Sequence, residues 1–566
     1  MTEPAELIQV ARGEKRANLV LKNCRVIDVL ASKIVQADVA IHDGFIAGVG
    51  TYDNAIETID LKGSYLAPAL IDGHTHIESS MLHPSRYAEA VVPRGTLTVI
   101  TDLHEIANAT GIAGVEFCIE WSTRLPLDMR FMAPSCVPAT PLETSGAVLD
   151  ATQIRELLAR PEVIGLGEMM NYPGVLAGLS DVLDKLSAAK GLPIDGHAPG
   201  LRGRDLDAYI AAGIMSDHEC TEIEEAAEKL SKGMHIMIRE GSSEKNLEAL
   251  LPLVTDKTYG RCMFVIDDRS AADLSSEGDI DHIIRKAISL GLNPIRALQL
   301  ASINPAQYFR LFDRGCIAPG KRAHLITFES LEEFQVDRVF HEGKLVAQGG
   351  KMVSSLPTPT SELTDSVRLG ELTRGSLRMA ASRDEFPVIE LIPGQIVTRK
   401  KMLRPLASNG EFVSDTDKDI LKLVVVERHS ATGNVGKGFV KGFGLQKGAL
   451  ASSVAHDSHN FVAVGASDDG ILGALKALEE MQGGLVVYCD GQVKAALPLP
   501  VAGLLSMEPL ATVLRMQREV EERARKLGQL PPAPFALLSF LALPVIPELR
   551  VTDLGVVDVG EFRIVA

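Results

Sequence analysis

The sequence has few aromatic residues, no paired cysteines and no long apolar run. Aromatic residues make up 5% of the 566 residues, and the seven cysteines are scattered without a single Cys-x-x-Cys pair. This odd, unpaired set argues against a disulfide framework and against a thiolate zinc cluster. It also excludes the Pro-Cys-x-x-Cys signature of the small zinc deaminases.

The sequence also lacks the features of membrane and nucleic-acid partners. It has neither a basic start followed by an apolar segment nor an uninterrupted apolar stretch of about 18 residues, so we expect a cytoplasmic protein. Its 57 basic residues are outnumbered by 74 acidic ones, and a net charge of -17 repels phosphate backbones and anionic lipids. We therefore expect no nucleic acid and no membrane as partner.

Two separated segments have the pattern of a small β domain. From Asn18 to about Lys62, short alternating apolar runs are divided by Asp-Gly and Asn-containing turns, which is typical of antiparallel strands. The segment from Cys316 to Val353 returns to the same style. We expect one small β-sandwich domain assembled from both flanks of the region between them.

The region between these segments alternates short β-rich runs with helical stretches, the layout of parallel strands joined by helices. Eight strand ends are predicted, near His74, Thr101, Val137, Glu168, His197, His218, Arg239 and Asp267. Eight such strands predict a (β/α)8 barrel of the TIM type.

The predicted fold is therefore α/β in several parts. The boundaries are 1–65 and 316–353 for the β domain, 66–315 for the barrel, 354–371 for a linker rich in proline and hydroxyl residues, and 372–566 for a C-terminal α+β domain. A homodimer is expected from the apolar content of 46% and the two domains beside the barrel.

Metal-ligating side chains stand at most of the predicted strand ends. His74 and His76 are two residues apart at the end of an apolar run, so both imidazoles leave the same face of the strand. The ends of parallel barrel strands meet at one mouth, where barrel active sites lie. The candidate metal ligands are His74, His76, Glu168, His197, His218 and Asp267.

Six nitrogen and oxygen ligands suit two divalent ions better than one. We expect His74, His76 and Asp267 at the first ion and His197 with His218 at the second, with Glu168 bridging them. Two ions that share a water make hydroxide near neutral pH, and Asp267 can take its proton and pass it to a leaving group. This arrangement predicts hydrolysis.

A second cluster follows the second predicted strand. Asp102 is a candidate to orient the shared hydroxide, and His104 or Glu105 to move substrate protons; the alternative is a capped turn between strand and helix. Glu78, just after the metal histidines, either contacts substrate or caps the next helix.

The longer strings around these residues closely resemble the bacterial adenine deaminases of the amidohydrolase superfamily. They are Ile71-Asp-Gly-His-Thr-His-Ile-Glu-Ser-Ser-Met, Asp102-Leu-His-Glu-Ile-Ala-Asn, Glu168-Met-Met-Asn-Tyr-Pro-Gly-Val, Asp195-Gly-His-Ala-Pro-Gly, Met237-Ile-Arg-Glu-Gly-Ser and Asp267-Asp-Arg. In the last domain, Gly448-Ala-Leu-Ala-Ser-Ser-Val-Ala-His-Asp-Ser-His-Asn also resembles that family.

The resemblance implies hydrolysis of adenine to hypoxanthine and ammonia, with two manganese or ferrous ions; the ligand chemistry is equally compatible with zinc. It further implies that the segment containing His456 and His459 faces the active site, either closing it over the purine or holding another ion. The alternative for this segment is an internal hydrogen-bonded turn.

Two other functions stay open for the same residues. The site could hydrolyse a cyclic amide, or the chain could be a metal-binding purine sensor without turnover. A mere binding protein has no need of the acid and base pair Asp267 and Asp102. We therefore expect hydroxide to attack C6 of adenine while Glu78, His104 or Glu105 protonates a ring nitrogen.

Overall fold

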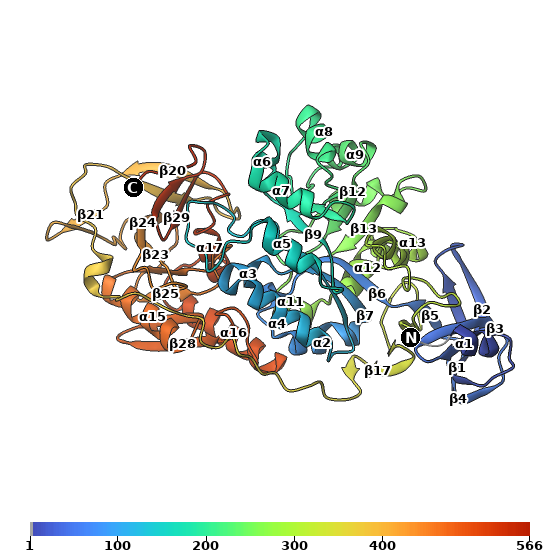
Figure 1. The fold of residues 1–566 in the computed structure, drawn as a ribbon. Helices are drawn as coiled ribbons and strands as arrows, with labels where there is room; N and C mark the ends of the chain where they lie inside the picture. Colours follow the sequence, from blue (N-terminus) through green and yellow to red (C-terminus); the bar gives the residue numbers. More distant parts are fainter. Residues whose placement is uncertain (1–3) are drawn as a thin grey trace.

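The computed structural model describes residues 4–566, which form three parts in a row (Figure 1). The barrel lies in the centre, with the small β domain on one side and the C-terminal domain on the other. Residues 1–3 lie outside the described part of the chain.

The barrel strands are parallel and follow the predicted order. They are β6 (Leu70–His76), β7 (Thr96–Asp102), β8 (Asp128–Ala133), β9 (Val163–Met169), β10 (Ile194–Gly196), β11 (Ser216–Asp217), β12 (His235–Arg239), β13 (Cys262–Val265) and its continuation β14 (Asp267–Asp268). Asp267 pairs with Thr75 of β6, which closes the barrel. Between β10 and β11 the described residues form one backbone hydrogen bond, from the amide of Met215 to the carbonyl of Ile194 (2.9 Å), in place of a ladder.

The barrel predicted from the sequence is therefore confirmed, with one shifted strand end. β8 ends at Ala133, before the predicted Val137. The cause is Pro134, which has no amide hydrogen to donate to a neighbouring strand.

Helices surround the barrel. They are α2 (Pro84–Val91), α3 (His104–Thr110), α4 (Ile112–Ser122), α5 (Ala151–Leu158), α6 (Tyr172–Ala177), α7 (Ser180–Ala188), α8 (Gly203–Ala211), α9 (Ile223–Ser231), α10 (Leu247–Leu250), α11 (Ala271–Ser276), α12 (Ile280–Ser289), α13 (Pro294–Leu300) and α14 (Ile303–Tyr308). In α12, Ile280, Ile283, Ile284 and Ala287 are buried, the spacing of one helical face turned to a core.

The small β domain combines both flanks of the barrel, as predicted. Its strands are β1 (Ala17–Asp28), β2 (Lys33–His42), β3 (Phe45–Gly50), β4 (Ala55–Asp60), β5 (Tyr65–Pro68), β15 (Leu325–Phe328), β16 (Arg338–His341), β17 (Lys344–Gln348) and β18 (Lys351–Met352). They form one hydrogen-bonded nine-stranded sheet, in which β5 joins β1 on one side to β15 on the other. Asp43 and Gly44 form the β2–β3 turn with positive φ angles, as a tight hairpin requires.

The C-terminal domain is built on an eight-stranded sheet. Its strands are β19 (Phe386–Leu391), β20 (Thr398–Leu403), β23 (Ile420–Val426), β24 (Val435–Lys441), β25 (Ala449–Ser452), β26 (Phe461–Gly465), β27 (Gly484–Cys489) and β28 (Gln492–Pro498); smaller pairings use β21 (Leu406–Ser408), β22 (Glu411–Val413), β29 (Leu549–Thr552), β30 (Gly555–Asp558) and β31 (Arg563–Ile564). The helices are α15 (Asp468–Glu480), α16 (Leu510–Arg525) and α17 (Pro534–Phe540). Val424 and Val426 of β23 pack with α15, whereas Leu423 and Val425 belong to the core on the other face.

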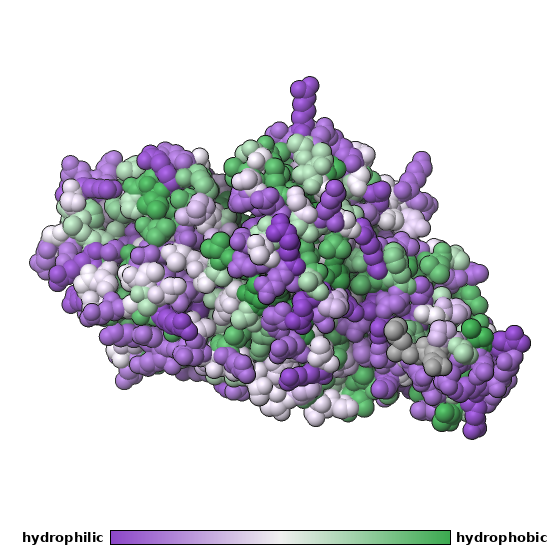
Figure 2. Space-filling view, in the orientation of Figure 1, coloured by the Kyte–Doolittle hydropathy of each residue, from purple (hydrophilic) through white to green (hydrophobic). Residues whose placement is uncertain are grey.

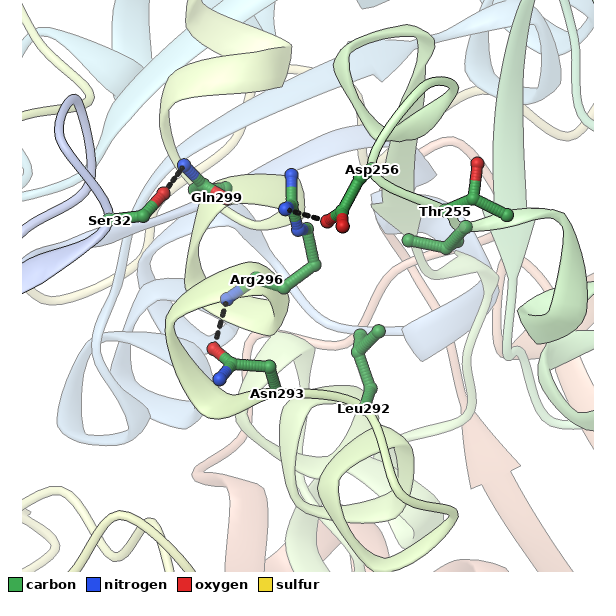
Figure 3. Close-up of a pocket in the computed structure, with 8 residues that line it drawn as sticks. Ser32, Thr255, Asp256, Leu292, Asn293, Arg296 and Gln299 are labelled. Atoms are coloured by element: carbon green, nitrogen blue, oxygen red, sulfur yellow. Dashed lines mark hydrogen bonds and ion pairs between the residues drawn. The ribbon is translucent and has the colours of Figure 1, made fainter.

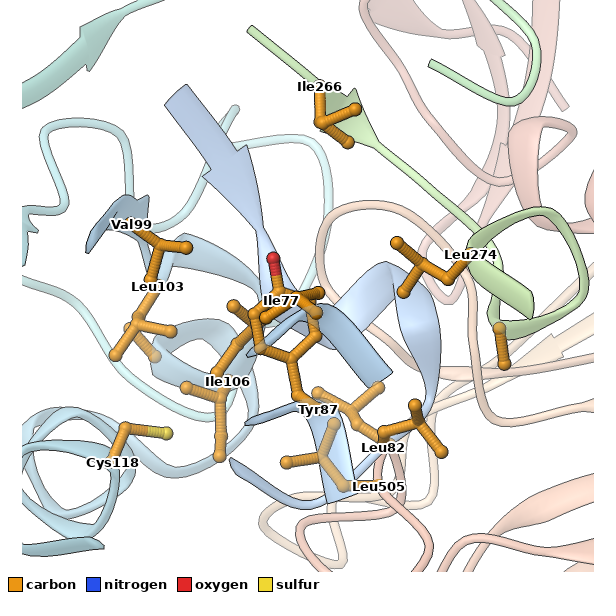
Figure 4. Packing of buried hydrophobic residues seen from close by; sticks show 14 of the residues in the cluster. Ile77, Leu82, Tyr87, Val99, Leu103, Ile106, Cys118, Ile266, Leu274 and Leu505 are labelled. Carbon is orange, nitrogen blue, oxygen red and sulfur yellow. The ribbon is translucent and has the colours of Figure 1, made fainter. Parts of the chain in front are cut away.

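Apolar side chains join this domain to the barrel. Figure 4 shows Leu505 beside Leu82 and Tyr87, which follow β6. Backbone hydrogen bonds on either side of Leu82 reinforce the contact, because the amide of His83 donates to Ser506 (3.0 Å) and the amide of Ser506 donates to Met81 (2.8 Å). The C-terminal domain is thus attached beside the strand that carries His74 and His76.

The face shown in Figure 2 is mostly hydrophilic, with its apolar residues in separate patches. Among residues 4–566, no helix is long and apolar enough to span a membrane.

Candidate metal centre

The six predicted ligands converge at one end of the barrel. His74 and His76 belong to β6, Glu168 to β9 and Asp267 to β14, while His197 and His218 each follow the last residue of their strand. All are buried except His197, whose side chain is 28% exposed. Histidines and carboxylates without a thiolate suit manganese, iron or zinc.

The first group consists of His74, His76 and Asp267 with one oxygen of Glu168. Oδ1 of Asp267 lies 3.4 Å from Nε2 of His74 and 3.3 Å from Nε2 of His76, which is also 3.2 Å from Oε1 of Glu168. Two ligands of a tetrahedral ion with bonds of about 2.1 Å lie about 3.4 Å apart. The donor atoms therefore have the spacing of ligands around one ion.

Hydrogen bonding leaves the correct nitrogen of His76 free for a metal. Its Nδ1 donates to the backbone carbonyl of Asp102 at 2.9 Å, so in the neutral ring Nε2 carries the lone pair. Nε2 of His74 is buried and has no hydrogen-bond partner in the described part of the chain. Burial and the neighbouring His218 lower the pKa of His74 to about 4, which keeps it neutral and able to bind a metal.

The second group shares Glu168 with the first. Oε2 of Glu168 lies 2.6 Å from Nδ1 of His197 and 3.2 Å from Nε2 of His218, whereas Oε1 faces His76. Burial alone would raise the pKa of Glu168, but the surrounding imidazoles hold it well below its usual range. The carboxylate is thus ionised, with one oxygen toward each group.

Asp102 supports Glu168 from the neighbouring strand. Its Oδ2 accepts a hydrogen bond from the amide of Glu168 at 3.0 Å, and a Cβ on Gly167 would lie only 1.9 Å from that oxygen. Gly167 is therefore required for this approach. Oδ1 of Asp102 is buried without a hydrogen-bond partner in residues 4–566 and lies 3.9 Å from Nδ1 of His104. Asp102 does not cap α3, whose N-cap residue, Leu103, makes no side-chain capping bond.

Glu78 and His104 border the same space. Oε1 of Glu78 accepts from the amide of Ile106 at 3.2 Å, so Glu78 bonds to the first turn of α3 while His83 caps the next helix, α2. Burial raises the pKa of Glu78 to about 7, which lets the carboxyl group hold a proton near neutral pH. Nδ1 of His104 lies 3.5 Å from Oε1 of Glu168.

Glu105 connects the barrel to the C-terminal domain. Its two oxygens accept hydrogen bonds from Nδ1 of His456 and Nε2 of His459. The other nitrogen of His459, Nδ1, accepts from the amide of Ala455 at 3.1 Å, so Nε2 carries the hydrogen in the neutral ring and has no lone pair for a metal. This arrangement favours closure over the site rather than another ion.

A cavity of about 390 Å³ lies beside Asp267, Glu105, His456 and His459. Barrel residues Glu78, Glu105 and Asp268 line one side, and His456 with Phe540 of α17 lines the other. The His456 ring is stacked on Phe540, with ring centres 5.2 Å apart. Although burial lowers the pKa of His456, the Glu105 carboxylate raises it to about 9. The cavity therefore offers an aromatic wall with a charged donor beside it.

A second cavity, of about 490 Å³, shares no residue with this cluster (Figure 3). It lies between Ser32 of the small β domain and α13, where Arg296 pairs with Asp256 at 2.8 Å. Its lining contains no histidine or cysteine among the described residues.

A third cluster, Asp128 with His324 and His341, also has the composition of a metal site. Arg314 lies 2.6 Å from Asp128, however, and Nδ1 of His324 accepts from the amide of Glu342 at 3.2 Å. Nε2 of His324 therefore carries the hydrogen and donates to Asp128. This cluster is a hydrogen-bonded ion network between the barrel and the small β domain.

Two residues at the mouth were given no role from the sequence. Glu219 follows His218, and its Oε1 lies 3.4 Å from Nε2 of that ring. Arg239, which ends β12, donates from Nη1 to Oδ2 of Asp267 at 2.7 Å and also bonds Glu219. Both residues could have been identified from the sequence, because Arg239 stood at a predicted strand end and Glu219 directly followed a predicted ligand.

Comparisons with known proteins cover almost the whole chain. Residues 65–346 match the amidohydrolase family model, and residues 395–563 match the adenine deaminase C-terminal domain. An adenine deaminase of Dehalococcoides mccartyi is 56% identical over 100% of this chain and 99% of its own length. An adenine deaminase 2 of Carboxydothermus hydrogenoformans is 50% identical over 99% and 98%.

Solved structures align with the chain at low identity. A β-aspartyl dipeptidase of Fervidobacterium islandicum is 17% identical, with a TM-score of 0.46 over 59% of this chain and 98% of its own. The two full-length relatives and the two domain matches together show that this chain belongs to the adenine deaminase family.

Proposed function

We propose that the chain hydrolyses adenine to hypoxanthine and ammonia at the cluster of His74, His76, Glu168, His197, His218 and Asp267. The observation that carries the proposal is the shared Glu168, whose two oxygens face different groups of imidazoles. Full-length relatives that carry the name adenine deaminase support the choice of substrate.

The reaction forms a bond from water oxygen to C6 of adenine and breaks the bond from C6 to the exocyclic nitrogen, which leaves as ammonia. Two divalent ions, when bound, supply the acidification of water that hydrolysis at neutral pH needs. The six proposed ligands are nitrogen and oxygen donors without a thiolate, and Nε2 of His74 has no hydrogen-bond partner in the described part of the chain. The bond from Nδ1 of His76 leaves the lone pair on Nε2 of its neutral ring. These features support a pair of ions, with manganese as our choice and iron or zinc as alternatives.

The remaining roles belong to the chain's own side chains. Asp267, ionised beside Arg239, would accept the proton of water and return it to the leaving nitrogen. Asp102 would hold Glu168 in place by accepting a hydrogen bond from the backbone amide of Glu168. Glu78, whose pKa is raised to about 7, is our candidate for protonating a ring nitrogen, with His104 and Glu105 beside it.

The purine would occupy the cavity between Glu78 and Phe540. A ring of that size fits about 390 Å³, and the stacked pair of His456 and Phe540 offers it a flat face. His459 would hold Glu105 and so keep the C-terminal segment closed over the base.

We also propose a cytoplasmic homodimer. All seven cysteines are buried and none forms a disulfide in the described chain, which is typical of a reducing compartment.

The test is ammonia release from adenine by protein loaded with manganese, beside a chelated sample, Glu168→Gln and the exposed control Glu57→Gln. We expect metal-dependent release, unchanged in Glu57→Gln and reduced by at least about 100-fold in Glu168→Gln. Ring opening of cyclic amides, without ammonia release from adenine, would favour the hydantoinase type of reaction. Adenine binding without turnover would favour a sensor.

A further inference from the structure

Glu219 stands where a further metal ligand would stand. Its Oε1 lies 3.4 Å from Nε2 of His218 and 3.7 Å from Nδ1 of His197. The same two nitrogens face Oε2 of Glu168, at 3.2 Å and 2.6 Å. Two imidazole nitrogens and two carboxylate oxygens thus surround one space.

These separations are ion-pair contacts that also match the spacing of ligands around one ion. Ligands of a tetrahedral ion with bonds of about 2.1 Å are separated by about 3.4 Å, and those of an octahedral ion by about 3.0 Å. Three of the four separations fall near these values; the shorter one, between His197 and Glu168, is a direct hydrogen bond.

With Glu219 included, the two groups become equivalent. His74, His76, Asp267 and Glu168 supply two nitrogens and two oxygens to the first, and His197, His218, Glu168 and Glu219 supply the same to the second. We propose that Glu219 is the fourth protein ligand of the second ion. This inference rests on the two-ion centre of the proposed function and adds a ligand to it.

Arg239 explains how Glu219 is held in this position. Nη1 of Arg239 bonds both Asp267 and Glu219, and Nη2 lies 3.2 Å from Oε2 of Glu219. Each carboxylate oxygen has two acceptor sites, so Oε1 can accept from Arg239 and still face the imidazoles. Arg239 is therefore a positioning residue that fixes one carboxylate of each group relative to the other.

The competing explanation is that Glu219 only neutralises Arg239. Glu219→Gln separates the two ideas, because the amide oxygen still accepts a hydrogen bond from Arg239 but binds a divalent ion poorly. Glu219→Asp is a second variant, since it keeps the charge and withdraws the carboxylate by one methylene. Glu222→Gln, exposed and three residues further along, is the matched control.

The measurement is manganese content per protomer across a chelator series, with electron paramagnetic resonance of the same samples. We expect the wild type and Glu222→Gln to retain two spin-coupled ions. Glu219→Gln and Glu219→Asp should lose one ion at a chelator concentration at least about 10-fold lower, leaving the signal of an isolated ion.

The outcomes separate this inference from the function on which it rests. Two ions in the wild type and unchanged retention in both variants would overturn the role of Glu219 and leave the two-ion centre intact. A wild type that holds no second ion would overturn both. If Glu219→Gln unfolds, Glu219→Asp decides the matter, with the metal-induced rise in its melting temperature as the readout.

Discussion

Replacing Gly167 by alanine should damage the site without touching any proposed ligand. A Cβ at this position would lie 1.9 Å from Oδ2 of Asp102, far inside the about 3.5 Å of ordinary van der Waals contact. Asp102 must therefore retreat by more than about 1 Å, which breaks its 3.0 Å hydrogen bond from the amide of Glu168.

The expected cost follows from the group that is left behind. A hydrogen bond to a charged group contributes about 1.5 to 3 kcal/mol, and here the amide of Glu168 stays buried without an acceptor. The usual stabilisation from glycine to alanine, about 0.4 to 1 kcal/mol, offsets only part of this cost. We expect a net loss of about 1 to 2 kcal/mol and, because Glu168 shifts, a fall in kcat/KM of about 10- to 100-fold.

The assay combines the thermal unfolding midpoint, metal content and kcat/KM for adenine. Gly260→Ala is the control, because a Cβ there would have no atom within 4 Å. Combining Gly167→Ala with Asp102→Ala gives a double-mutant cycle. If the clash is the cause, the double variant should be no worse than Asp102→Ala alone. Normal stability and metal content in Gly167→Ala would refute the reasoning.

Two further predictions concern the domain contact and pH. Glu105→Gln leaves an acceptor for only one of His456 and His459, so the KM for adenine should rise about 10-fold with a smaller change in kcat. The control is the exposed Glu120→Gln, which should change neither constant. Equal KM values in Glu105→Gln and the wild type would contradict the closing role of Glu105. Burial raises the pKa of Asp279 from 3.8 to about 6. A raised carboxyl pKa contributes stability below pH of about 4 that is lost as pH rises through about 6. Asp279→Asn should therefore be the more stable protein at pH 7 and lose that advantage toward pH 4, measured by thermal unfolding at both values beside the exposed Asp256→Asn. Parallel pH profiles of wild type and Asp279→Asn would contradict this assignment.

Local patterns in the sequence were sufficient for the barrel and for the convergence of the proposed ligands at its mouth. The two-residue spacing of His74 and His76 at the end of an apolar run places both rings on one face, whatever surrounds the strand. Glu168 and Asp267 were found in the same way, because parallel strands bring their ends to one mouth. Pro134 in turn ends β8 early, a local effect that was present in the sequence and was missed.

Only the tertiary structure decided how these groups face one another. Glu105 bonds His456 and His459, which are 351 and 354 residues away, and no spacing along the chain specifies such a pairing. The same holds for Arg239, which bonds Asp267 and Glu219, and for the two oxygens of Glu168, each turned to a different group. Periodicity determines which face of an element a residue occupies, but hydrogen-bond partners and ligand geometry depend on how separate elements pack at distances of about 3 Å.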